Sequence, residues 1–273
     1  MAINQVSLTS GMRANLFSLQ KTSQMMEKTQ ERLSTGKRVS TALDDPVNFF
    51  AAQGHTQRAS DLSFRKDEMS EAIQTVKAAD KGISAITSLI DAAKSLAQSA
   101  LSASTTDEVT ELMGQFDQIR TQIDTLAQDS GYKGINLLDD DTLTVKFDET
   151  GVDSKLDLVG FDATTTGLSI AAGDSWAIND TTTIEDAITD LDNAKTTLRT
   201  ESKKLSSNLS IITAREDFTT QMIQTLQDGA GKLTDADMNE EGANMLMLQT
   251  QQSLAVNSLS LASQAAQAVL RLF

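Results

Sequence analysis

Side chains that commonly carry catalysis or bind metals are scarce in this chain of 273 residues. It has no cysteine and a single histidine, His55, so thiolate nucleophiles, thiolate metal sites and histidine clusters are excluded. A Ser-His-Asp triad would depend on that one imidazole, and no matching serine motif accompanies it. The run Asp139-Asp140-Asp141 could attract Ca2+, but consecutive carboxylates without further ligand spacing are more typical of a solvated turn. We therefore expect no enzymatic activity, no cofactor and no metal site.

The net charge of -15, from 38 acidic and 23 basic residues, argues against two classes of partner. Nucleic-acid binding needs clustered lysine and arginine to displace counterions from phosphates, and anionic membrane surfaces repel an acidic protein. No stretch of about 20 apolar residues could span a bilayer. Residues 1–7 also lack the basic and apolar regions of a secretory signal, so we expect any export to proceed without a cleaved signal peptide.

Most of the negative charge is concentrated in the middle of the chain. Residues 139–190 contain 13 acidic residues against Lys146 and Lys155, a net charge of -11. Residues 143–147, 155–159 and 167–170 are β-branched segments separated by glycine, aspartate and threonine, which predicts short strands. Trp176 is expected to anchor the core of this insert, with stacking on a sugar as the alternative.

Apolar residues at alternating spacings of three and four predict helices on both flanks of this insert. The inner series run from Val76 to Ala100, from Val109 to Leu126 and from Ile184 to Leu226, where Gly229 and Gly231 are expected to end the helix. Asp45-Pro46 is typical of a helix start. The terminal series are Met12, Leu16, Leu19, Ser23, Met26, Gln30 and Leu33, ending at Gly36, and Met245, Leu248, Gln252, Ala255, Leu259, Ala262, Ala266, Val269 and Phe273.

These series predict a mainly α fold: an elongated antiparallel helical rod with coiled-coil termini and a small β-rich central insert. The terminal series are rich in serine, glutamine and alanine, so a pair of such helices buries too little apolar area to be stable alone. We therefore expect a polymer subunit whose ends become helical when copies pack together. The predicted domains are an N-terminal assembly helix at 1–43 that is disordered in the monomer, the two halves of the rod at 44–136 and 184–230, the insert at 137–183, and a C-terminal assembly helix at 231–273.

Four motifs, in order along the chain, resemble those of bacterial flagellins. They are Glu31-Arg-Leu-Ser-Thr-Gly-Lys-Arg38 with Ala42-Leu-Asp-Asp-Pro46, Tyr132-Lys-Gly-Ile-Asn-Leu-Leu138, Asp235-Ala-Asp-Met-Asn-Glu-Glu241, and the ending from Leu261 to Phe273. The resemblance covers residues 1–138 and 184–273. One departure is Ser263-Gln264-Ala265-Ala266-Gln267, where flagellins often carry a proline.

The resemblance implies an extracellular structural protein that polymerises with itself into the flagellar filament used for motility. It also implies an export chaperone, hook-associated proteins and a cap protein as partners. The alternative function is a cell-surface protein that recognises polysaccharide or a host surface. Arg38 with Asp44 and Asp45 would form an ion pair between subunits or, alternatively, a local cap with a surface charge. The predicted assembly residues are Leu16, Leu19, Met26, Leu33, Arg38, Asp44, Asp45, Met245, Leu248, Leu259, Val269 and Phe273.

Overall fold

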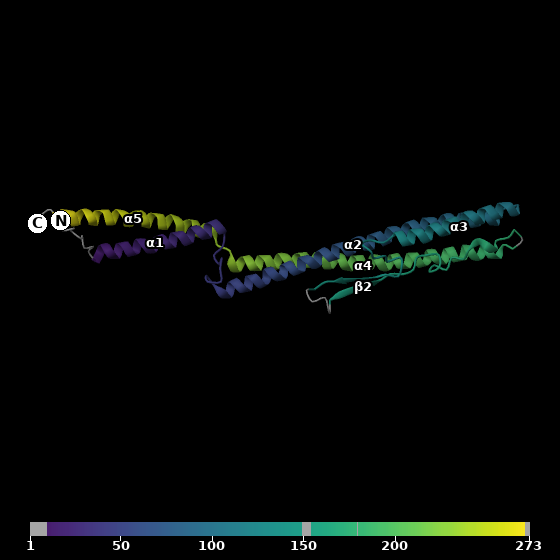
Figure 1. The fold of residues 1–273 in the computed structure, drawn as a ribbon, viewed down its shortest axis with the longest axis horizontal. Helices are drawn as coiled ribbons and strands as arrows, with labels where there is room; N and C mark the ends of the chain where they lie inside the picture. Colours follow the sequence, from purple (N-terminus) through teal and green to yellow (C-terminus); the bar gives the residue numbers. More distant parts are fainter. Residues whose placement is uncertain (1–9, 149–153, 179, 271–273) are drawn as a thin grey trace. The chain divides into compact units, whose positions relative to one another are not determined.

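The computed structural model describes residues 10–148, 154–178 and 180–270 and is mainly α-helical, as predicted. Its elements are α1 (Ser10–Thr35), α2 (Pro46–Leu101), α3 (Thr106–Asp129), β1 (Thr142–Lys146), β2 (Lys155–Val159), the short 3-10 helix η1 (Gly173–Ser175), α4 (Thr182–Thr234) and α5 (Met238–Leu270) (Figure 1). The chain forms two compact units. The terminal unit comprises residues 1–57 and 226–273, and the central unit comprises residues 58–225.

The core of the central unit lies where α2, α3 and α4 pack together. The α2 series predicted from the sequence is buried at every position from Val76 to Ala100. Phe116 and Ile123 of α3 and Leu191 and Leu198 of α4 are fully buried against it. The heptad pattern of the inner helices therefore correctly predicts which faces form the core.

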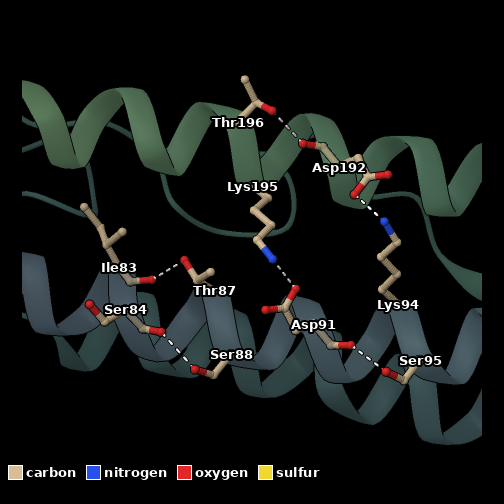
Figure 2. A network of polar contacts seen from close by, with 10 residues as sticks. All are labelled: Ile83, Ser84, Thr87, Ser88, Asp91, Lys94, Ser95, Asp192, Lys195 and Thr196. Atoms are coloured by element: carbon tan, nitrogen blue, oxygen red, sulfur yellow. Dashed lines mark hydrogen bonds and ion pairs between the residues drawn. The ribbon is translucent and has the colours of Figure 1, made fainter.

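Two ion pairs lie side by side on the surface of the central unit and link α2 to α4, with one lysine and one aspartate from each helix (Figure 2). Lys94 Nζ lies 2.6 Å from Asp192 Oδ1, and Lys195 Nζ lies 2.5 Å from Asp91 Oδ1. Residue numbers rise along α2 as they fall along α4, so the two helices are antiparallel. Since both carboxylates are about half exposed, these pairs fix the register of the helices more than they stabilise the fold.

The central insert is a hairpin followed by an irregular segment. β1 and β2 pair antiparallel, with Leu143 opposite Leu158 and Lys146 opposite Lys155. Leu143, Val145 and Leu158 point into the core shared with the helices. Two of the three predicted strands are therefore confirmed, and one face of the hairpin is buried.

The third predicted strand, at 167–170, is wrong because this segment forms turns bonded to α3. The Asp124 carboxylate accepts hydrogen bonds from the backbone N–H and the hydroxyl of Thr165, at 2.6 and 3.1 Å. Arg120 donates to the carbonyl of Ile170 at 3.1 Å. Ser169 has a left-handed φ of 57°, which a strand does not accommodate. Contacts with a helix thus determine the conformation of this segment.

Trp176 anchors the end of the insert, but against α3 and not within a separate small core. It is 8% exposed, and its ring lies 4.6 Å from the ring of Phe116, centroid to centroid, in a tilted arrangement. An aromatic pair at this distance stabilises packing beyond the area that it buries. The anchoring role predicted for Trp176 therefore agrees with its buried position.

The predicted end of the last inner helix at Gly229 and Gly231 is also wrong, because α4 continues to Thr234. Neither glycine has a positive φ, so both fit ordinary helix geometry. The helix ends where Asp235 pairs as a bridge with Lys37 from the N-terminal part of the chain. A contact distant in sequence, and not the glycines, sets the end of α4.

In the terminal unit, α1 and α5 lie side by side and run antiparallel (Figure 1). Arg32, near the end of α1, contacts Glu241, near the start of α5. Gly36 follows α1 with φ of 70°, and its N–H donates to the carbonyl of Arg32 at 2.8 Å. This left-handed cap ends α1 as the sequence predicts.

Candidate assembly interface

Residues 31–39 and 233–241, from opposite ends of the sequence, meet in a junction that holds the terminal unit together. The carbonyl of Thr234 accepts hydrogen bonds from the backbone N–H groups of Arg38 and Val39, at 2.7 and 3.1 Å. The Arg38 guanidinium donates to the carbonyl of Leu233 at 3.2 Å. The last carbonyls of a helix have no partner within the helix and carry partial negative charge, so these contacts cap α4.

The junction contains an ion pair that sequence reasoning missed. Arg32 Nη1 lies 2.7 Å from Glu241 Oε1, and the Glu241 side chain is only 7% exposed. Both residues belong to the motifs quoted above, but sequence alone does not show that the two motifs touch. The available signal for this ion pair was one charged residue, Arg32 or Glu241, next to the apolar series of each terminal helix. Charged residues at such positions are buried mainly when they are paired.

Asp44 and Asp45 each have backbone partners of their own within the subunit, and the charge of Arg38 also acts on Asp45. Asp45 caps α2 by accepting a hydrogen bond from the backbone N–H of Asn48 at 3.1 Å, and this bond holds the pKa of Asp45 below its ordinary value. The backbone N–H of Thr41 is the main cause of a lowered pKa at Asp44, whose carboxylate also lies 3.5 Å from Lys28 Nζ. Within one subunit, these carboxylates thus act as local caps.

On α1, the face that contacts α5 differs from the predicted series. Every second position of the observed series lies one residue earlier in the sequence than predicted. Leu16 and Gln30 of the predicted series are exposed, with Leu16 at 41%. Thr22 and Thr29 are buried on this face, whereas the larger Leu16 lies outside it. The buried or half-buried positions that continue the spacing are Met12, Asn15, Leu19, Thr22, Met26, Thr29 and Leu33.

On α5, the face toward α1 follows the predicted series over the described side chains. Leu248 is buried, and Met245, Gln252, Ala255, Leu259 and Ala262 are half-buried. Glu241 extends the same series by four residues toward the start of the helix. The side chain of Val269 and the whole of Phe273 lie outside the described residues.

The outer faces of α1 and α5 expose many large apolar side chains. These are Leu16, Phe17 and Met25 of α1 and Met238, Leu246, Met247, Leu254, Val256 and Leu261 of α5. Residues 242–270 contain no charged residue at all. Exposed apolar surface of this extent is typical of a protein–protein contact, since soluble monomers rarely retain it.

Net charge is distributed unevenly between the two units. The terminal unit contains 8 basic and 9 acidic residues, whereas the central unit contains 15 basic and 29 acidic residues. The central unit therefore carries -14 of the total charge of -15. Copies of the terminal unit can approach one another without strong like-charge repulsion.

Over the part of the chain that the structure describes, no group of three acidic or histidine side chains is placed to hold a metal ion. Within the same residues, no helix is long and apolar enough to cross a membrane. The Asp141 carboxylate accepts a hydrogen bond from the backbone N–H of Asn136 at 2.8 Å, which places it in a turn.

Comparison with known proteins gives consistent results over both flanks. The family model for the bacterial flagellin N-terminal helical region matches residues 3–142, and that for the bacterial flagellin C-terminal helical region matches residues 181–273. Flagellin FljM of Caulobacter vibrioides is 29% identical over 277 residues, which span 100% of each chain. A flagellin of Brucella melitensis is also 29% identical, over 94% of this chain and 95% of its own. The crystal structure of Bacillus cereus flagellin has 18% identity and a TM-score of 0.48, covering 56% of this chain and 88% of that one.

Proposed function

Because the chain belongs to the bacterial flagellin family, we propose that the outer faces of α1 and α5 are the surfaces through which one subunit packs against the next. The protein is a structural subunit of the extracellular flagellar filament and is not an enzyme. It polymerises with copies of itself.

The observation that carries the proposal is the apolar outer face of α5. Leu246, Leu254 and Leu261 are each more than 60% exposed, and the helix around them is uncharged. Full burial of one such side chain stabilises a contact by roughly 1.5–3 kcal/mol, so a few of them offset the entropy lost on association. The seam between α1 and α5, which includes Thr22, Thr29 and Gln252, offers less apolar area.

The predicted assembly residues then divide into four groups. Leu19, Met26, Leu33, Met245, Leu248 and Leu259 hold α1 to α5 within the subunit, whereas Leu16 belongs to the outer contact face. Val269 and Phe273 continue the α5 series toward the C-terminus. Arg38, Asp44 and Asp45 shape the segment that connects α1 to α2 and assist assembly through it.

We assign assembly to residues 1–43 and 231–273, the rod to 44–136 and 184–230, and the insert to 137–183. The terminal unit is only marginally stable in the monomer because its own seam is weak, and the terminal helices gain further order on assembly. An export chaperone, hook-associated proteins and a cap protein would contact the same exposed apolar faces, since these are the surfaces that must be covered before and at the ends of polymerisation.

The test is polymerisation of purified full-length Leu254→Asp, observed by electron microscopy after seeding. Leu254 is 61% exposed, so the variant should keep the circular dichroism of the wild-type monomer. Burial of the new carboxylate at an apolar contact costs several kcal/mol, so filaments should be absent. Leu254→Met is the matched control and should polymerise normally. Wild-type polymerisation by Leu254→Asp would contradict the assignment of this face.

A further inference from the structure

The first turns of α2 display an apolar face that nothing in the described part of the terminal unit covers. Val47, Phe50, Ala51 and Gly54 are all exposed and lie at positions i, i+3, i+4 and i+7 of the helix. Val47 is 77% exposed and Phe50 60% exposed, and Leu43, just before the helix, is 96% exposed. Helices that bind in a groove present anchors at this spacing. We call Leu43, Val47, Phe50, Ala51 and Gly54 the α2 start face.

Gly54 supplies a second observation at this face. Glycine inside a helix is destabilising relative to alanine, so its presence needs a reason. Among the residues that the structure describes there is no steric reason, because a Cβ added at Gly54 would meet none of their atoms within 4 Å, and its φ is not positive. A close approach by the backbone or side chains of another molecule supplies that reason.

A groove that fits such a face lies in the central unit, between α2, the turn at 132–135 and strand β1. Its volume is about 550 Å3, within the range of protein binding pockets. Ala72, Ile135, Leu143 and Val145 form an apolar floor, and Phe64, which is 60% exposed, forms part of the rim.

On the strand side, the groove contains a lysine whose neighbour in the sheet is another lysine. Lys146 lies directly opposite Lys155 in the hairpin, and like charges in such a pair repel. Lys155 is compensated by Asp157, whose Oδ2 lies 3.1 Å from Lys155 Nζ. No carboxylate among the described residues lies within ion-pair distance of Lys146. An anionic group from outside the subunit would remove this repulsion.

Acidic side chains line the opposite, helical side of the groove. They are Asp67, Glu68 and Glu71 of α2. Two of them are compensated within the subunit, because Glu68 lies 2.7 Å from Arg65 and Glu71 lies 3.0 Å from Lys133. An incoming carboxylate is therefore favoured on the strand side, next to β1.

We propose that the α2 start face of one copy docks into this groove of a second copy. Val47 and Phe50 rest on the apolar floor, and the carboxylates of Asp44 and Asp45 face Lys146. Each carboxylate can accept several hydrogen bonds, so the local caps at Asp44 and Asp45 persist in the contact. Two different surfaces in contact form a heterologous interface, which is the kind that builds an open helical polymer. The proposal rests on the filament function and deepens it.

Crosslinking tests the contact directly, because the wild-type chain has no cysteine. Full-length Val47→Cys and Thr144→Cys are mixed, polymerised and oxidised mildly. Thr144 lines the groove, and its replacement leaves Lys146 in place. Disulfide-linked dimers should form in filaments and not in monomer solution. In a parallel mixture, Val159→Cys replaces Thr144→Cys as the control, since Val159 is 71% exposed but does not line the groove.

A second variant separates docking from folding. Gly54→Gln improves helix propensity, so the melting temperature of the monomer should not fall. The added side chain blocks close approach, and the critical concentration for polymerisation should rise about tenfold or more. Gly114→Gln is the matched control, at an exposed helical glycine whose added Cβ also meets nothing within 4 Å, and it should polymerise like wild type.

The outcomes distinguish this docking from the assembly role of α1 and α5. The docking would be overturned if filaments of normal appearance formed and Val47→Cys linked to Val159→Cys, or linked to neither Thr144→Cys nor Val159→Cys. The assembly role of α1 and α5 would then remain intact. Normal polymerisation by Gly54→Gln would also overturn it. Filaments formed normally by Leu254→Asp would instead contradict the assembly role.

Discussion

Replacement of Glu241 by alanine should destabilise the terminal unit strongly and selectively. The carboxylate forms a 2.7 Å ion pair with Arg32 and is almost fully enclosed, whereas the Arg32 side chain is 28% exposed. Removing one partner of a buried pair costs about 3–5 kcal/mol, because the remaining charge is left without compensation. Since water can partly reach Arg32, we expect a loss of about 2–4 kcal/mol in the free energy of unfolding of this unit.

The chain offers a way to measure the two units separately. Its single tryptophan, Trp176, and single tyrosine, Tyr132, both lie in the central unit. In urea titrations, tryptophan fluorescence therefore reports the central unit, while far-ultraviolet circular dichroism reports helices of both. The Glu241→Ala variant should lose part of its helical signal at lower urea concentration, with the Trp176 transition unchanged.

Two controls separate the ion pair from simple loss of packing. The double variant Arg32→Met with Glu241→Leu should be close to wild type, because apolar replacement of both partners is often neutral. Asp192→Asn breaks a pair whose carboxylate is 53% exposed, and it should cost about 1 kcal/mol or less. The reasoning is refuted if Glu241→Ala costs less than about 1 kcal/mol, or if the Trp176 transition shifts as far as the helical signal.

Three further substitutions probe the central unit. Gly82→Ala should cost about 1–3 kcal/mol in urea unfolding followed by fluorescence, because its Cβ would lie 2.6 Å from Leu138 Cδ1; an unchanged midpoint would contradict this packing. Phe116→Ala should cost about 3–5 kcal/mol and shift the Trp176 emission to longer wavelength, since Phe116 is fully buried against that ring; an unshifted spectrum would mean that the rings are not in contact. Hydrogen bonds, first from Lys133 and then from Tyr132, hold the pKa of Glu71 below its ordinary value of 4.5. The ionised Glu71 therefore stabilises the folded protein above pH 4.5, and this contribution is lost as the pH falls through the lowered pKa. Glu71→Gln should therefore be less stable than wild type at neutral pH, with the difference disappearing in acid, and a difference that grows in acid would reverse the sign of this argument.

The sequence did not correctly predict which face of α1 contacts α5. Alternating steps of three and four residues from Met12 can pass through Leu16 or through Asn15, and hydrophobicity favours Leu16. The structure places Asn15, Thr22 and Thr29 on the face toward α5 and leaves Leu16 exposed. A helix with apolar residues on more than one face therefore does not reveal which face meets its partner within the subunit.

The two wrong local predictions, a strand at 167–170 and a helix end at Gly229 and Gly231, have a related cause. Residues 167–170 have strand-like composition, yet hydrogen bonds to Asp124 and Arg120 of α3 hold the segment in turns. Gly229 and Gly231 resemble a helix end, yet α4 stops only where Arg38 and Val39 cap it. In both cases the deciding partner lies far away in the sequence, and local propensity is a weak preference by comparison.

The sequence by itself determined the mainly α class, the core faces of the inner helices, the first two strands of the insert, and the absence of cysteine chemistry. These properties follow from periodicity and composition, which act over a few residues or over the whole chain. Only the tertiary structure decided that the two terminal motifs meet through Arg32 and Glu241, and that α1 turns Leu16 and Phe17 outward. Such contacts depend on the distance between side chains brought together by folding, and sequence spacing does not encode that distance.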